Sequence, residues 1–216
     1  VYAFANSRNL RSVPDIQLDL ALGNYMTPAA GRVPVIKLGF YQLRPGSVGF
    51  VQVQSANPFQ APSIQPNYLD NEIDQQVAVA GIKALRRMLN TSELQPYNDG
   101  EELPGPSATD DRACFEFARE AGLTAYHVSG TCKMGASADP QAVVDQELRV
   151  CGIDGLRVVD ASIMPFVPSA NTSAAVFMIA EKAADMILGR PALAPQEFGK
   201  QKVGHPAMFA HAEPAE

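Results

Sequence analysis

His127 lies in a polar, glycine-containing segment that is unusual for a packed apolar core. Residues 125–135 read AYHVSGTCKMG, so serine, glycine, threonine and lysine follow the histidine within a few positions. Gly130 and Gly135 suggest a backbone that approaches another group closely, because glycine has no Cβ. Histidine has an unperturbed pKa of about 6.5 and can exchange a proton at neutral pH. His127 is therefore a candidate acid–base residue, although the residue type alone favours a histidine satisfied within a core.

A second candidate site is the segment that leads into the last predicted helix. A strand candidate ends at Asp160, a loop follows, and Asn171 and Thr172 open the helix. The first turn of a helix presents unpaired N–H groups and the positive end of its dipole, which favour an anionic or electron-rich group. Asparagine and threonine are also common N-cap residues, and spacing alone favours that structural role here.

The first third of the chain has the alternating hydrophobicity of antiparallel strands. Apolar and polar residues alternate over residues 16–22, 36–41 and 51–54, which is the period of a half-buried strand. The sequence RPGS at residues 44–47 predicts a type II turn with a positive φ at Gly46. The second and third runs are therefore predicted to form a hairpin. Further short strand candidates lie at residues 143–145, 148–150 and 156–159.

Three segments have the 3.6-residue period of amphipathic helices. The first covers residues 70–88, with Asp74 predicted to face water, and a shorter helix runs from an N-cap at Thr109 to Gly122. The last covers residues 172–188 and is stopped by a glycine and a proline. The predicted buried stripe of the first helix is Ile73, Val77, Ala80, Ala84, Leu85 and Met88. The predicted buried stripe of the last helix is Val176, Ile179, Ala180, Ala183 and Ile187.

Composition argues against several classes of function. The 216 residues carry a formal net charge of −6, without the run of lysine or arginine that a nucleic-acid partner requires. No stretch approaches the roughly 20 apolar residues of a membrane-spanning helix. Cys114, Cys132 and Cys151 have no disulfide or zinc-ligand spacing and favour a reducing compartment, and Cys114 and Cys151 are expected to be small buried residues. His205 and His211 lie in a tail that is predicted to be flexible, so no metal site is expected.

Several ordered motifs run through the chain: YHVSGTCKMG at 126–135, GLRVVDASIMP at 155–165, NT at 171–172, MIAEKAADMI at 178–187, LRPGS at 43–47 and PNYL at 66–69. Together they resemble the C-terminal part of the glucose–methanol–choline (GMC) oxidoreductases, and their style is closest to the choline dehydrogenase-like branch. The resemblance extends from about Pro14 to Arg190. It implies an α/β fold with α+β character, in which an antiparallel substrate-domain sheet with helices joins the C-terminal piece of an FAD-binding α/β domain.

The resemblance also implies a division of the chain. Residues 1–123 are expected to form part of the substrate-binding domain, residues 124–190 the C-terminal segment of the FAD-binding domain with the active site, and residues 191–216 a flexible tail. The family's glycine-rich fingerprint, GxGxxG, does not occur in the sequence, so a missing N-terminal FAD-binding half is the expected partner. Without that half, exposed apolar surface and unpaired strand edges are expected, and these favour self-association.

Site residues follow from the same resemblance. The family's catalytic histidine falls on His127, and its second polar residue at the flavin falls on Asn171. The positions that fall on or near FAD contacts are Asp160, Ala161, Asn171 and Thr172. Ser129 departs from the family pattern, where valine or alanine is commoner, and is expected to perturb the site little.

The implied function is FAD-dependent oxidation of a small alcohol by hydride transfer to the flavin, with His127 as general base and Asn171 donating to the substrate oxygen. A GMC-fold lyase or photoenzyme, and an inactive lobe that functions only with a partner fragment, are the alternatives. The chain alone is expected to be inactive and not to retain FAD. A cytoplasmic or membrane-peripheral location is expected. Neither the particular alcohol nor the electron acceptor follows from the sequence.

Overall fold

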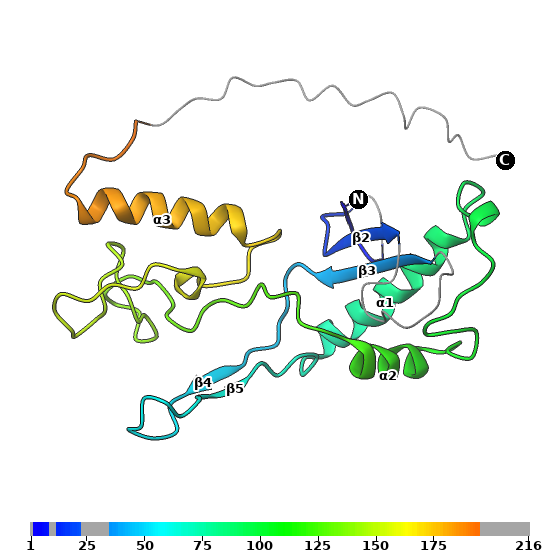
Figure 1. Cartoon of the computed structure of the whole chain (residues 1–216), viewed down its shortest axis with the longest axis horizontal. Coiled ribbons are helices and arrows are strands. Elements are labelled where there is room, and N and C mark those ends of the chain that lie inside the picture. Colours follow the sequence, from blue (N-terminus) through cyan, green and yellow to red (C-terminus); the bar gives the residue numbers. More distant parts are fainter. Residues whose placement is uncertain (1, 9–11, 23–34, 195–216) are drawn as a thin grey trace.

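The computed structural model describes residues 2–8, 12–22 and 35–194, and an antiparallel three-stranded sheet forms at the N-terminal end of the chain (Figure 1). Its strands are β1 (Tyr2–Ala5), β2 (Ile16–Leu22) and β3 (Ile36–Gln42), in the order β1-β2-β3. The predicted strands at residues 16–22 and 36–41 are confirmed. Gln17 pairs with Tyr41 in the register of β2 and β3, so these two side chains share one face of the sheet.

The predicted hairpin between residues 36–41 and 51–54 is wrong. β3 pairs with β2, whereas β4 (Phe50–Gln52) pairs with β5 (Ser63–Gln65) in a separate two-stranded sheet. Figure 1 shows this ribbon extending away from the three-stranded sheet. The chain therefore leaves β3 instead of folding back on it.

The turn after β3 is held by Asp74 and not by a positive φ at Gly46, which that glycine does not adopt. The backbone N–H groups of Gly46 and Ser47 each donate to the Asp74 carboxylate at 2.8 Å, and the Ser47 hydroxyl donates at 2.5 Å. Gln42 Nε2 adds a fourth bond at 2.9 Å. Asp74 is only 2% exposed, so its predicted water-facing position is wrong. A carboxylate from a distant helix thus supplies acceptors that the turn itself lacks.

Helix α1 (Glu72–Leu89) packs on the sheet through a face that differs from the predicted one. Asn71 is the N-cap, and its side chain accepts from the N–H of Ile73 at 2.8 Å. The Ile73 side chain, predicted to be buried, is 60% exposed. The buried residues of the helix are Asp74, Val77, Ala78, Gly81 and Ile82. A Cβ at Gly81 would lie 2.3 Å from the ring of Phe40 on β3, so this glycine allows the helix to approach the sheet closely.

The buried carboxylate of Asp74 makes stability depend on pH. Burial by itself raises the pKa of this carboxyl, but the hydrogen bonds from Gly46, Ser47 and Gln42 outweigh burial and hold the pKa below its ordinary value. A carboxyl group whose pKa is lowered by folding stabilises the fold above its unfolded pKa, about 3.9 for aspartate. This contribution is lost as the pH falls through the folded-state pKa.

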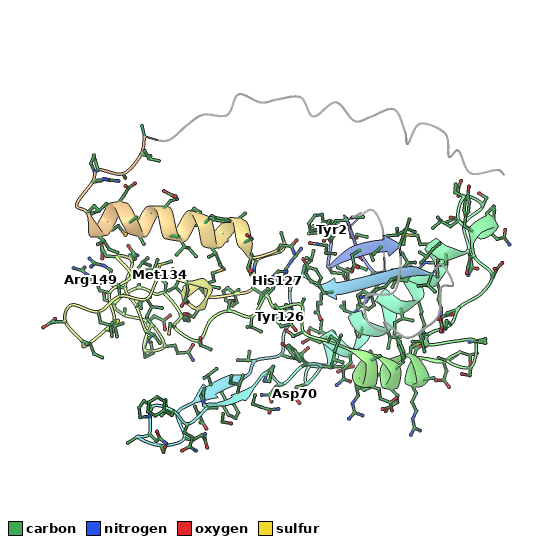
Figure 2. The ribbon with its side chains drawn as sticks, in the orientation of Figure 1. Tyr2, Asp70, Tyr126, His127, Met134 and Arg149 are labelled. Atoms are coloured by element: carbon green, nitrogen blue, oxygen red, sulfur yellow. The ribbon has the colours of Figure 1, made fainter. Side chains whose placement is uncertain are left out.

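Replacing Asp74 with asparagine is expected to destabilise the fold by about 2–3 kcal/mol at neutral pH, because an NH₂ group then faces donors. The thermal midpoint of the complete protein, followed by circular dichroism, should fall by a few degrees. The difference from wild type should shrink as the solution is acidified. Asp70→Asn removes the same charge from an exposed position just before α1 and is the matched control (Figure 2). Equal midpoints for the two variants would contradict the role given to Asp74.

Helix α2 (Asp111–Ala121) lies beside α1 (Figure 1). Its N-cap is Asp110, whose side chain accepts from a helix N–H at 2.8 Å, so the predicted cap at Thr109 is wrong by one residue. Arg86 of α1 forms an ion pair with Glu101 and donates to two backbone carbonyl groups of the loop before α2. The half-buried guanidinium of Arg86 therefore joins α1 to the loop before α2.

Residues 124–194 pack around α3 (Ser173–Ile187) with a hydrophobic core of their own. The buried residues of this core are Val144, Leu148, Ile163, Met164, Ile179 and Ala183. The strand candidates at 143–145, 148–150 and 156–159 form only isolated β-bridges, because turns separate them. Gly189, with a φ of 65°, follows the end of α3 as predicted. Ala180 and Ile187 are exposed, contrary to the prediction, because the core contacts a narrower face of the helix.

The described residues also include two short 3-10 helices, η1 (Gln95–Tyr97) and η2 (Ala161–Ile163).

Large apolar side chains are exposed on this part of the chain, as expected. Phe166 and Phe177 are 83% and 70% exposed.

Cys114 is fully buried as predicted, but the predicted burial of Cys151 is wrong because this cysteine is exposed. None of the helices in the described residues is long and apolar enough to cross a membrane. His205 and His211 lie outside the described residues.

Candidate active site

The segment that follows His127 is tied to η2 by backbone hydrogen bonds. The N–H of Cys132 donates to the carbonyl of Ser162 at 3.0 Å, and the N–H of Met134 donates to the carbonyl of Ile163 at 2.8 Å. Residues 164–172 connect η2 to the start of α3, and His127 lies within hydrogen-bond distance of Thr172 at that start. Figure 2 shows His127 at the junction between the α3 part and the end of β3.

Two residues with a positive φ flank the histidine. Tyr126 has a φ of 58°, a conformation that costs a non-glycine residue roughly 1–2 kcal/mol. Its N–H donates to Thr124 Oγ1 at 3.1 Å, which helps to hold the turn. Gly130 has a φ of 92°, and a Cβ there would lie 3.5 Å from the carbonyl oxygen of Met164. That distance is an ordinary contact, so the close approach predicted at Gly130 is not found, whereas at Gly135 an added Cβ would lie 2.8 Å from Ala142 Cβ. The positive φ of Tyr126 is backbone strain of the kind that is concentrated at functional sites.

Both ring nitrogens of His127 have a partner at the start of α3. Nδ1 lies 3.1 Å from Thr172 Oγ1, and Nε2 lies 2.8 Å from Asn171 Nδ2. Thr172 occupies the N-cap position, but its side chain makes no capping hydrogen bond to the helix. The capping role that spacing alone favours for these side chains is therefore wrong, because both are directed to the histidine.

Two residues of the three-stranded sheet extend the contacts of Asn171 and His127. Gln17 Nε2 donates to Asn171 Oδ1 at 3.1 Å, and the Tyr41 hydroxyl donates to Gln17 Oε1 at 2.6 Å. The rings of Tyr41 and His127 are tilted by 58°, with centroids 5.5 Å apart. Burial raises the pKa of the Tyr41 phenol, and the charges of Tyr2 and Asp19 raise it further. Tyr41 therefore remains a protonated donor at neutral pH.

The polarity of the bond between Asn171 and His127 decides what the imidazole can do. An amide NH₂ group only donates, so His127 Nε2 accepts from Asn171 and carries a lone pair. The ring hydrogen then lies on Nδ1 and is directed to Thr172 Oγ1. Nε2 is thus the ring atom that can take a proton.

The remaining residues expected to contact FAD lie at the start of η2. Asp160 caps η2 by accepting from the N–H and the hydroxyl of Ser162, and both bonds end at Oδ1. Oδ2 is therefore available to another group. Ala161 is half-buried at the first position of η2. The hydroxyl of Ser129 is buried and has no hydrogen-bond partner among the described residues, which is a polar atom that a bound group could satisfy.

Sequence patterns did not indicate Gln17, Tyr41 or Arg44 as site residues. Alternation placed Gln17 on the polar face of its strand, yet its side chain is 1% exposed. The register of β2 with β3, which brings Gln17 opposite Tyr41, was the signal that could have found both. Arg44 donates to Ser169 Oγ at 3.0 Å and to the Pro14 carbonyl at 2.5 Å, and so ties the loop before Asn171 to the sheet.

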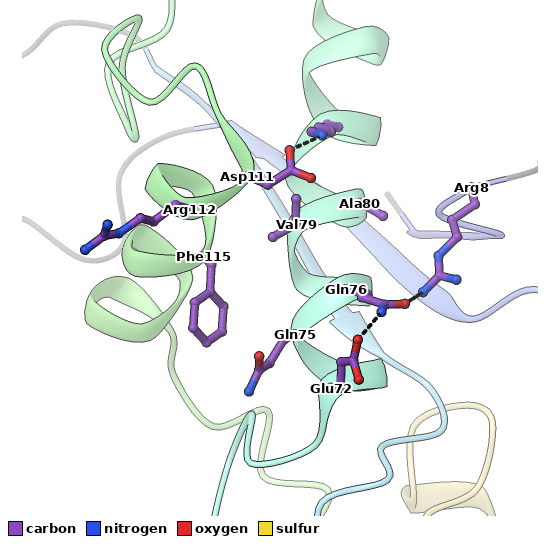
Figure 3. Close-up of a pocket in the computed structure, with 10 residues that line it drawn as sticks. Arg8, Glu72, Gln75, Gln76, Val79, Ala80, Asp111, Arg112 and Phe115 are labelled. Carbon is purple, nitrogen blue, oxygen red and sulfur yellow. Dashed lines mark hydrogen bonds and ion pairs between the residues drawn. The ribbon is translucent and has the colours of Figure 1, made fainter.

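A groove between α1 and α2 lies away from this site (Figure 3). Several of its polar side chains are engaged with one another: Arg8 donates to Gln76, Gln76 donates to Glu72, and Lys83 pairs with Asp111. Arg112 also lines the groove, and Figure 3 shows its guanidinium directed away from α1. Across the described ranges, no cluster of histidine, cysteine and carboxylate side chains could hold a metal ion.

A family model described as GMC oxidoreductase matches residues 45–180, which include His127 and Asn171. The chain belongs to the GMC oxidoreductase family. Mitochondrial choline dehydrogenase of Homo sapiens is 44% identical over 185 residues, which are 83% of this GMC chain and 31% of that protein. An oxygen-dependent choline dehydrogenase of Staphylococcus aureus is 43% identical over 159 residues, which are 73% of this chain and 28% of that protein. The chain therefore spans less than a third of the length of these relatives.

Solved structures of GMC oxidoreductases have the same fold as this chain. Pyridoxine 4-oxidase from Mesorbium loti has a TM-score of 0.76 at 30% identity, covering 88% of this chain and 38% of that one. An FAD-dependent oxidoreductase from Chaetomium thermophilum has a TM-score of 0.67 at 28% identity, covering 82% and 28%. The predicted resemblance and the mixed fold with antiparallel sheets and helices are confirmed.

Proposed function

We propose that the complete GMC protein containing this chain oxidises a small alcohol with FAD, and that His127 takes the hydroxyl proton. The observation that carries this proposal is the pair of contacts from Asn171 and Thr172 to the two ring nitrogens of His127. A side-chain N-cap bond stabilises a helix by about 1 kcal/mol. Two residues at a helix start that bind a histidine and forgo this bond favour a functional role.

An alcohol fits the polarity of the bond between Asn171 and His127. A hydroxyl that enters between them accepts from Asn171 Nδ2 and donates to His127 Nε2. Transfer of the proton to Nε2 leaves negative charge on the alcohol oxygen, which the Asn171 amide stabilises. The chemistry that FAD supplies when bound is acceptance of hydride from the alcohol carbon. Because the alcohol releases hydride more readily once its proton is gone, the two transfers support each other.

The residues proposed to contact FAD are Asp160, Ala161, Asn171 and Thr172. The open Oδ2 of Asp160 and the unpartnered hydroxyl of Ser129 provide polar atoms for a bound group. The start of α3 lacks a side-chain cap, so its N–H groups and dipole favour negative charge on a group bound there. Residues 1–123 are proposed as substrate-domain chain and residues 124–190 as FAD-domain chain.

Anaerobic mixing of the complete protein with choline and with neutral primary alcohols tests the proposal. Choline is the first alcohol to try because two relatives at 43% and 44% identity are choline dehydrogenases. At least one alcohol is expected to bleach the visible absorbance of the oxidised flavin. A flavin that stays oxidised with every alcohol, while the protein reacts in light or cleaves a substrate, would support the photoenzyme or lyase alternative.

Residues 1–216 expressed alone are expected to be colourless and inactive, because the sequence lacks the GxGxxG segment that binds the dinucleotide phosphates. The measurement is the flavin absorbance of the chain after incubation with FAD and gel filtration, with the complete protein as control. The elution volume of the same sample reports whether the exposed apolar surface causes self-association. Stoichiometric FAD in the isolated chain would refute the expectation.

A further inference from the structure

Gln17 is a buried amide whose oxygen and nitrogen are both engaged. Tyr41 donates to Oε1 at 2.6 Å, and Nε2 donates to Asn171 Oδ1 at 3.1 Å. The side chain is 1% exposed, so no water can replace either partner freely. An unsatisfied buried polar group is costly, and turning over the Gln17 amide alone would place its oxygen against Asn171 Oδ1. The orientations of the two amides are therefore coupled, and in the structure the Tyr41 hydroxyl donates to the oxygen end of Gln17.

In the chain of hydrogen bonds that runs from Tyr41 to His127, the donor and the acceptor of each bond follow from the bond before it. Because Tyr41 donates to Gln17, the NH₂ end of Gln17 faces Asn171. Asn171 must then present Oδ1 to Gln17 and Nδ2 to the imidazole, which places a donor 2.8 Å from His127 Nε2. Thr172 does not select the tautomer, because a hydroxyl near Nδ1 can either donate or accept. The amide of Asn171 is the contact that does.

We propose that Gln17 and Tyr41 are positioning residues that fix the amide of Asn171 and, through it, the tautomer of His127. The proposal rests on the function proposed above, in which Nε2 of His127 takes the alcohol proton. Gln17 lies 154 residues before Asn171, so the sheet selects the reactive form of a histidine that belongs to the other part of the chain. The sheet therefore contributes to the acid–base chemistry as well as forming a wall of the site.

Loss of Gln17 leaves the Asn171 amide free to turn over. In the reversed orientation Oδ1 faces His127 Nε2 and accepts a hydrogen from it. The tautomer with hydrogen on Nε2 is then favoured, and the atom that must take the alcohol proton no longer has a lone pair. The fold of α3 is not required to change, because neither amide orientation involves a helix N–H.

Nitrogen-15 NMR of the complete protein with labelled histidine side chains tests this proposal, since the two tautomers give different ring-nitrogen signals. The His127 signals are assigned from their loss in a His127→Ala variant, at a pH where the ring is neutral. In wild type, hydrogen on Nδ1 and an unprotonated Nε2 are expected. Gln17→Leu, which removes both polar ends at similar size, should shift the population toward hydrogen on Nε2.

Tyr41→Phe provides a second variant if Gln17→Leu does not fold, because it keeps the ring beside His127 and removes only the hydroxyl. A smaller shift in the same direction is expected. Gln65→Leu makes the same exchange at an exposed position of β5 and should leave the His127 signals unchanged. Identical tautomer populations in wild type and both site variants, or hydrogen on Nε2 in wild type, would overturn the proposal.

Kinetics provide the second readout. The limiting rate of flavin reduction by alcohol should fall about 3–10-fold in Gln17→Leu, the effect of one hydrogen bond, with a smaller change in KM. An unchanged limiting rate together with a shifted tautomer would overturn the catalytic part of the proposal. If His127→Ala itself leaves the rate unchanged, the proposed function fails, and the NMR comparison still decides whether Gln17 sets the tautomer.

Discussion

Replacing His127 with alanine in the complete protein is expected to slow the reduction of its flavin by alcohol about 10²–10⁴-fold, which is the usual contribution of a general base. The variant lacks the Nε2 lone pair that faces the Asn171 amide, so the hydroxyl proton has no acceptor at that position. The measurement is the stopped-flow rate of flavin bleaching at saturating alcohol without oxygen.

Added imidazole should restore part of the rate to His127→Ala, because a free base can enter the space that the ring occupied. The surface substitution Glu181→Ala on the exposed face of α3 is the control and should keep the wild-type rate. A His127→Ala rate within a few-fold of wild type, at normal flavin content, would remove the histidine from the proposed chemistry.

Replacing Asn171 with alanine is expected to lower the same rate about 10²–10³-fold, the cost of losing one donor to a developing oxyanion. The thermal midpoint should fall only moderately, because the change leaves Gln17 Nε2 without its acceptor but removes no cap of α3. The pair of measurements separates the two roles of this residue. An unchanged rate with a lowered midpoint would limit Asn171 to a structural role.

Asn171→Asp sharpens this comparison. The carboxylate keeps the size of the amide but has no hydrogen to donate, and its charge beside His127 favours the protonated ring, which is no longer a base. This variant is therefore expected to be as slow as Asn171→Ala. Thr172→Ser keeps a hydroxyl near Nδ1 and is expected to retain most of the rate.

Local patterns predicted the elements whose signals lie within a few residues. The strands β2 and β3, the glycine after α3 and the helix α1 all follow from periodicity and stop signals of neighbouring residues. The predicted hairpin was wrong because strand pairing depends on which strand is nearest in space.

The burial of Asp74 was missed for a similar reason. Its charge and its position in α1 predict exposure, but the N–H groups of the turn around Gly46 need acceptors, and this carboxylate is buried against them.

The candidate site shows the same division. His127, Asn171 and the helix start that carries Thr172 were found through ordered motifs that resemble the GMC oxidoreductases, and the structure brings these residues together. Gln17 and Tyr41 were not found, because an amide on the polar face of a strand has the same pattern whether it faces water or a buried partner. Their role depends on a contact across 154 residues.

The sequence by itself determined the family, the candidate base His127 and the polar residue Asn171 that accompanies it, because motif order and residue type can be read without knowing the fold. Only the tertiary structure decided that Asn171 and Thr172 bind the histidine and leave α3 without a side-chain cap. The physical reason is that a hydrogen bond has a direction only when both partners are in place. His127 therefore acquires a defined lone pair on Nε2 from contacts that no local pattern contains.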